Sequence, residues 1–101
     1  MAATRGDLET VAGLVKRALV PYNLKPDDVD IEVLAERLLD SGSLLLAEVV
    51  DLGGAAGPLA DWHTLTDAGP GDGPLGQWNH ARGLARTVRR MLELLPAAAT
   101  R

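Results

Sequence analysis

The sequence predicts an all-α fold: a small bundle of three to four helices with a long Gly/Pro-rich loop before the last helix. Apolar side chains recur three and four residues apart in several segments, which is the spacing of one buried helix face. Proline or glycine follows each of these segments and marks its end. Seven glycines and three prolines fall within residues 53–76, so we expect this stretch to be a loop.

The length of the chain indicates a single helical domain over residues 1–101. A domain of 101 residues buries enough surface for a modest core, and an apolar content of 47% can fill it. The chain has no Phe, and its only aromatic residues are Tyr22, Trp62 and Trp78. Most of the core must therefore come from Leu, Val and Ala.

The first helix is expected over residues 7–20. Pro21 ends it, because proline lacks a backbone N–H and disfavours helix at the residue before it. Its apolar face consists of residues at helical spacing, namely Leu8, Val11, Ala12, Val15, Ala18, Leu19 and Tyr22.

Two helices are expected in the middle of the chain, over residues 28–40 and 43–52. Aspartates suit the first turn of the former, since carboxylates stabilise the positive end of the helix dipole. Gly42 is a natural helix end, and Ser43 can cap the helix that follows. The latter segment is short and almost wholly apolar, so a buried strand is the alternative to a helix there.

The last helix is expected over residues 77–95, after a loop in which one turn of helix can form at Pro58–His63. Its apolar residues alternate three and four apart over two heptads, as in a helix packed along another helix. They are Ala81, Leu84, Val88, Met91 and Leu95. We expect the first and last helices to enclose the middle pair.

Composition narrows the location and the chemistry. The absence of Cys excludes disulfides, thiolate metal sites and a cysteine nucleophile. The first residues lack the apolar run of a secretory signal, and no apolar stretch is long enough to span a bilayer. We therefore expect a cytoplasmic protein with no membrane segment. The excess of Arg over Lys, eight to two, is typical of a GC-rich bacterial or phage genome.

Charge is distributed unevenly along the chain, whose net charge is −4. Eight Asp or Glu residues against the single Arg37 give residues 26–52 a net charge of −7. Five arginines against Glu93 give residues 77–101 a net charge of +4. These segments are suited to pairing within the chain or between copies of it. The acidic total argues against nucleic acid as a partner, because phosphate binding needs cations.

One glycine-rich segment, Gly71 to Gly76, matches the G-x-G-x-x-G pattern of dinucleotide-binding loops. That motif depends on a strand that delivers the glycines to a helix N-terminus, where free amides bind a pyrophosphate. Here no strand is predicted before the glycines, and Pro74 removes one amide. We interpret the segment as a loop that enters a helix, and expect no cofactor.

The two histidines, His63 and His80, are the only candidates for a metal or catalytic site, together with Asp61. Such a site needs several ligands that converge from rigid elements, and no spacing such as H-x-x-x-H fixes two of them together. We interpret both histidines as surface residues and expect no bound metal. A small metal-dependent enzyme that uses this region is kept as an alternative.

The arginines of the last predicted helix are the candidate partner-binding residues. Arg82, Arg86 and Arg89 lie on the side opposite its apolar face, where they are either solvated or contact an acidic protein surface. Trp62 and Trp78 flank the loop and are added to the candidates, because Trp is enriched at interface hot spots. Core packing is the more frequent role of such residues.

These observations predict a small non-enzymatic protein–protein interaction module, bound to another protein or to a second copy of itself. The heptad spacing, the segregated charge and the lack of a catalytic constellation support it. A helix-turn-helix DNA-binding protein, using the middle helices or the arginine helix, is the first alternative. The metal-dependent enzyme is the second.

Overall fold

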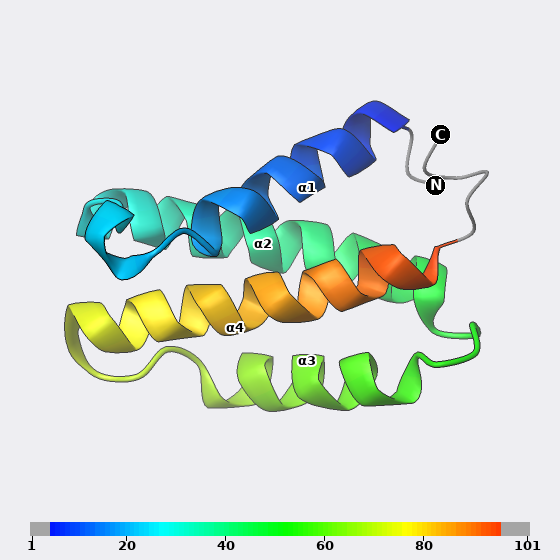
Figure 1. Ribbon diagram of the computed structural model, residues 1–101. Helices are drawn as coiled ribbons and strands as arrows, with labels where there is room; N and C mark the ends of the chain where they lie inside the picture. The colour runs from blue at the N-terminus through cyan, green and yellow to red at the C-terminus, as the bar shows by residue number, and fades with distance from the viewer. Residues whose placement is uncertain (1–4, 96–101) are drawn as a thin grey trace.

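The computed structural model describes residues 5–95, in which every regular element is helical (Figure 1). The four α-helices are α1 (Arg5–Ala18), α2 (Asp28–Val49), α3 (Ala56–Ala68) and α4 (Gly73–Leu94), and a short 3-10 helix, η1 (Tyr22–Leu24), joins α1 to α2. The all-α prediction is confirmed. No helix within the described part is both long and apolar enough to cross a membrane.

Helix α4 is at the centre of the bundle. It packs against each of the other three helices, and α1 also packs against α2. Successive helices run in opposite directions, and α1 and α3 lie on opposite sides of the α2–α4 pair (Figure 1). The predicted arrangement, with the first and last helices around the middle pair, is therefore wrong. Buried apolar side chains run along α4 from Trp78 to Met91, and α4 contacts all three other helices.

Helix α2 is one continuous helix and not two. The predicted break at Ser41 and Gly42 does not occur, because Gly42 lies inside the helix and is buried there. An added Cβ at Gly42 would lie 2.0 Å from Cη2 of Trp62, so glycine is needed for the approach of α3 and not to end a helix. The segment for which a strand was the alternative is helical up to Val49.

Helix α3 lies within the segment predicted as a loop. None of the ten glycines and prolines of residues 53–76 falls between 59 and 68, so the interior of the segment is free to form a helix. Pro58 lies in the first turn, where proline is tolerated. Gly69, at φ 67°, ends the helix with its N–H donated to the carbonyl of Leu65.

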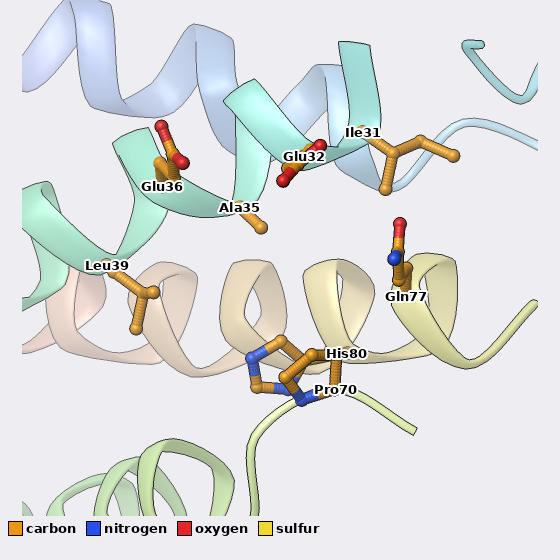
Figure 2. A pocket seen from close by; sticks show the side chains of 8 residues that line it. All are labelled: Ile31, Glu32, Ala35, Glu36, Leu39, Pro70, Gln77 and His80. Carbon is orange, nitrogen blue, oxygen red and sulfur yellow. The ribbon is translucent and has the colours of Figure 1, made fainter. Parts of the chain in front are cut away.

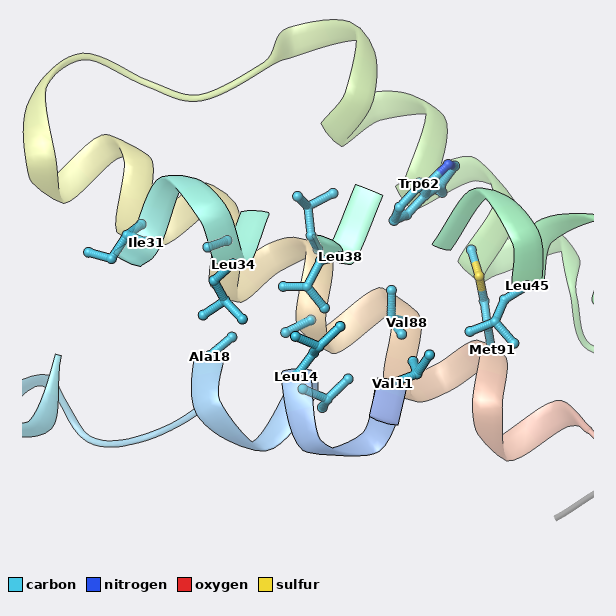
Figure 3. Packing of buried hydrophobic residues seen from close by; sticks show 14 of the residues in the cluster. Val11, Leu14, Ala18, Ile31, Leu34, Leu38, Leu45, Trp62, Val88 and Met91 are labelled. Carbon is cyan, nitrogen blue, oxygen red and sulfur yellow. The ribbon is translucent and has the colours of Figure 1, made fainter. Parts of the chain in front are cut away.

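The core forms where α1, α2 and α4 meet, and Trp62 extends it toward α3 (Figure 3). The predicted apolar face of α4 is confirmed from Ala81 to Met91, since every member of that series is fully buried. The largest fully buried side chains are Trp78, Ile31, Leu34, Leu38, Leu84, Met91, Val49 and Val88. Aliphatic side chains therefore form most of the core, as the composition predicts.

Candidate functional site

Both tryptophans belong to the core. Trp62 is 3% exposed and Trp78 is 1% exposed. Figure 3 shows Trp62 pointing from α3 toward the cluster of buried side chains. The core-packing interpretation is therefore confirmed, and neither ring forms part of a surface that a partner could contact directly.

Arg82 is engaged inside the bundle. Its Nη1 donates hydrogen bonds to the carbonyl oxygens of Val20 and Ala18, at 2.6 and 3.3 Å. Its guanidinium carbon lies 5.5 Å from the centre of the Trp78 ring, within the range of a cation–π contact. The last backbone carbonyls of a helix have no hydrogen-bond donor within it. Arg82 supplies a donor to the carbonyls at the end of α1. Its role is structural in this arrangement.

The remaining arginines of α4 differ from one another. Arg90 pairs with Asp61 of α3 at the surface. Arg86 and Arg89 are exposed and have no ion pair among the described residues. Of the three arginines predicted to bind a partner, Arg89 lines a surface groove. The arginines of α4 thus fall into three groups. Arg82 contacts α1, Arg90 contacts α3, and Arg86 and Arg89 have no ion pair among the described residues.

The groove that Arg89 lines lies between α1 and α4 and has a volume of about 570 Å³. Val15, Leu19 and Leu92 give it an aliphatic floor, with Ala12 and Gly13 beside them. Lys16 and Arg89 are its only charged lining residues. This α1/α4 groove is therefore both apolar and cationic. Sequence reasoning missed it, because its two cations come from helices far apart in the chain.

A second surface feature follows the outer side of α2. Three aliphatic side chains are solvent-exposed there, with exposed fractions of 70% for Val29, 42% for Val33 and 70% for Leu44. Glu36 and Asp40, also exposed, fall between them at helical spacing. We call these five residues the outer α2 stripe. It is an acidic and aliphatic helix face, bordered by the exposed Arg37, with no partner among the described residues.

The two histidines have different surroundings. His63 is exposed on α3, as expected of a surface histidine. His80 is buried on α4, so the prediction for it is wrong. Burial lowers the pKa of the His80 imidazole from 6.5, because the charged form loses hydration. Asp61, the third member of the suggested catalytic set, is paired with Arg90. Among the described residues no group of three side chains could hold a metal ion.

His80 lines a small pocket between α2, α4 and the connection from α3 to α4 (Figure 2). Its apolar wall consists of Ile31, Ala35, Leu39 and Pro70. Its polar lining consists of Glu32, Glu36, Gln77 and His80. We call this the α2/α4 pocket, and its volume is about 190 Å³.

We expect the stability of the protein to fall between pH 7 and pH 5 because of His80. Below pH 6.5 the unfolded chain binds a proton at this imidazole that the folded chain, with its lower pKa, does not bind. The stability is therefore complete above pH 6.5 and decreases as the pH falls. The difference in melting temperature between pH 7 and pH 5 should be smaller for His80→Gln than for the unchanged chain. His63→Gln is the control and should leave the difference as it was.

The glycine-rich segment Gly71 to Gly76 connects two helices, with no strand before it. An added Cβ at Gly76 would lie 2.4 Å from the carbonyl carbon of Gly71, so these glycines allow one backbone to pass close to another. This agrees with a loop that enters a helix. The helix-turn-helix alternative was based in part on two separate middle helices. The structure has one continuous helix there, because residues 28–40 and the segment after them both belong to α2.

The fold and surface define a small all-α protein in which three helices pack around α4, with a cationic groove and an acidic helix face. Residues 9–100 match the model of a family of unknown function, DUF6415, and the chain belongs to that family. Neither the comparison with curated proteins nor the comparison with solved structures found a match.

Proposed function

We propose that this protein is a non-enzymatic protein–protein interaction module that associates with further copies of itself. The outer α2 stripe of one copy binds in the α1/α4 groove of the next. The observation that carries the proposal is the complementarity of these two surfaces on one chain. One is a cationic groove with an aliphatic floor, and the other is an acidic helix face with exposed aliphatic side chains.

The match has the form of a helix bound in a groove. In that mode an amphipathic helix places side chains at i, i+3, i+4 and i+7 into an apolar groove. Val29 and Val33 are anchors of this kind, four residues apart, and Leu44 lies eleven residues further along the same face; Val15, Leu19 and Leu92 supply the floor. The stripe's carboxylates would lie near Lys16 and Arg89, where opposite charges fix the register and speed the encounter.

The positions of the two surfaces determine the kind of assembly. The residues that line the groove belong to α1, to Leu19 just after its end, and to α4. The buried side of α2 faces those helices, so its outer stripe faces away from them, except at its edge, where Glu36 also lines the α2/α4 pocket. The two surfaces therefore lie on opposite sides of the molecule, and the contact between copies is head-to-tail. Such contacts give rings or open chains instead of closed dimers.

We expect the charge reversal Lys16→Glu with Arg89→Glu to weaken self-association by about tenfold or more, because it replaces attraction by repulsion across the contact. Light scattering after size exclusion, over a range of protein concentrations, measures the effect. The average mass of the unchanged chain should rise with concentration and fall with added salt. Arg17→Glu, an exposed cation of α1 outside the groove, is the control and should change little.

A charge-swap experiment tests the pairing itself. Glu36→Lys with Asp40→Lys gives a chain whose stripe and groove are both basic. The groove variant has a stripe and a groove that are both acidic. Each variant alone should be monomeric, and an equal mixture should associate again. A monomeric unchanged chain at high concentration, or a mixture that stays monomeric, would refute self-association. If the Lys16→Glu, Arg89→Glu variant loses no more association than the Arg17→Glu control, the contact lies elsewhere.

A further inference from the structure

The α2/α4 pocket has the chemistry of a binding site for a small cationic ligand. We propose that it binds a primary ammonium group carried on a compact apolar body, such as a small aryl or alkyl amine. The ammonium lies between Glu32 of α2 and the imidazole of His80, and the apolar body lies against Ile31 and Leu39; Figure 2 shows Glu36 at the rim, with its carboxylate turned away from the imidazole. This proposal does not depend on self-association.

His80 gives the first reason for a ligand. Its side chain is about nine-tenths buried, and it has no hydrogen-bond partner among the described residues. Buried polar groups in proteins are almost always paired, so one without a partner needs an explanation. No buried side-chain nitrogen or oxygen in the described part is both sealed from solvent and unpaired. The ring nitrogens of His80 are therefore accessible to solvent, and a ligand in the pocket that His80 lines can bind them.

The charge of the pocket gives the second reason. Glu32 and Glu36 are four residues apart on α2, and like charges at that spacing repel each other. No Lys or Arg lines the pocket to offset them. A bound cation removes this repulsion. The lowered pKa keeps the His80 imidazole neutral at pH 7, so one ring nitrogen is free to accept a hydrogen bond from an ammonium N–H.

The size and lining of the pocket limit the rest of the ligand. Its volume of about 190 Å³ exceeds the cavity of about 150 Å³ that holds one benzene molecule. Ile31, Ala35 and Leu39 of α2 offer an apolar wall, and Pro70 adds an apolar residue from the connection between α3 and α4. A ring or short alkyl chain with one methylene-linked ammonium matches this space. A larger ligand would extend into solvent.

Titration with benzylammonium, followed by NMR of the histidine rings and the backbone amides, tests the proposal. We expect saturable shifts at His80, Ala35 and Leu39, with no change at the exposed ring of His63. Benzyl alcohol has the same shape without the charge and should bind about tenfold more weakly or not at all. Phenylacetate carries the opposite charge and should not bind.

Variants identify the groups responsible. Glu32→Gln and Glu36→Gln should each weaken the binding of benzylammonium by about two- to fivefold, as expected for partly solvated ion pairs. Glu48→Gln, the same change on the same helix outside the pocket, should leave the affinity unchanged. Lys16→Glu with Arg89→Glu should also leave it unchanged, so a failure of the self-association proposal would be separable from a failure of this one.

The pH dependence gives an independent readout. The groups that face the ligand are Glu32 and Glu36 from α2 and His80 from α4. Affinity should fall once the pH decreases below the lowered pKa of His80 and its imidazole becomes cationic. Equal binding of benzyl alcohol and benzylammonium would show an apolar cavity with no selectivity for charge. That result would overturn the proposal. NMR shifts confined to residues outside the pocket, or the absence of any saturable shift, would overturn it as well.

Discussion

Gly42→Ala should destabilise the protein by about 1–3 kcal/mol, although alanine is the better helix former by about 1 kcal/mol. The new Cβ would lie 2.0 Å from Cη2 and 2.5 Å from Cζ3 of Trp62, far inside contact distance. The indole ring is rigid and only 3% exposed, so it can move only if α3 moves with it. Urea denaturation followed by circular dichroism measures the change.

Two comparisons isolate the contact between Gly42 and Trp62. Gly13→Ala on α1 introduces a Cβ with no heavy atom within 4 Å, so it should stabilise the protein by up to about 1 kcal/mol. In a Trp62→Leu background the clash is relieved, and Gly42→Ala should become neutral or stabilising. If Gly42→Ala stabilises the unchanged chain as much as Gly13→Ala does, then α3 is not packed on α2 at this point.

The same contact explains why the sequence could not predict the whole fold. Gly42 carries the local signal of a helix end, and only the approach of Trp62, twenty residues later, gives it a different role. Periodicity predicted a first helix and the buried face of α4 because each signal is local to one helix, but α1 ends at Ala18, and Ala12 and Tyr22 of its predicted apolar face are exposed. Helix α3 was missed because its flanking glycines and prolines dominated the composition of the segment, while its interior contained none.

The candidate sites depend even more on long-range contacts. The α1/α4 groove brings Lys16 beside Arg89, and the α2/α4 pocket brings Glu32 beside His80. Neither pair has a sequence spacing that would indicate it. The segregation of charge could be read from the chain, but not which cations are free. Arg82 and Arg90 are engaged by neighbouring helices, and this division needs the packing of α4 to be known.

Arg82→Met should destabilise the protein by about 2 kcal/mol, more than any other single arginine change on α4. Methionine keeps much of the aliphatic length, but leaves the carbonyls of Ala18 and Val20 without their donor. A hydrogen bond from a charged group contributes about 1.5–3 kcal/mol, and partial access of water to these carbonyls reduces the loss. The cation–π contact with Trp78 is lost as well.

Arg90→Met is the matched control for Arg82→Met. It removes an ion pair with Asp61 in which both side chains are about half exposed, so its cost should stay below about 1 kcal/mol and decrease further with added salt. The cost of Arg82→Met should be insensitive to salt, because its acceptors are uncharged carbonyls. Equal costs for the two variants in chemical denaturation would mean that Arg82 does not hold the end of α1. A loss of self-association in the Arg82→Met variant would therefore indicate a destabilised bundle. A loss in the Lys16→Glu, Arg89→Glu variant would instead indicate that the groove takes part in the contact.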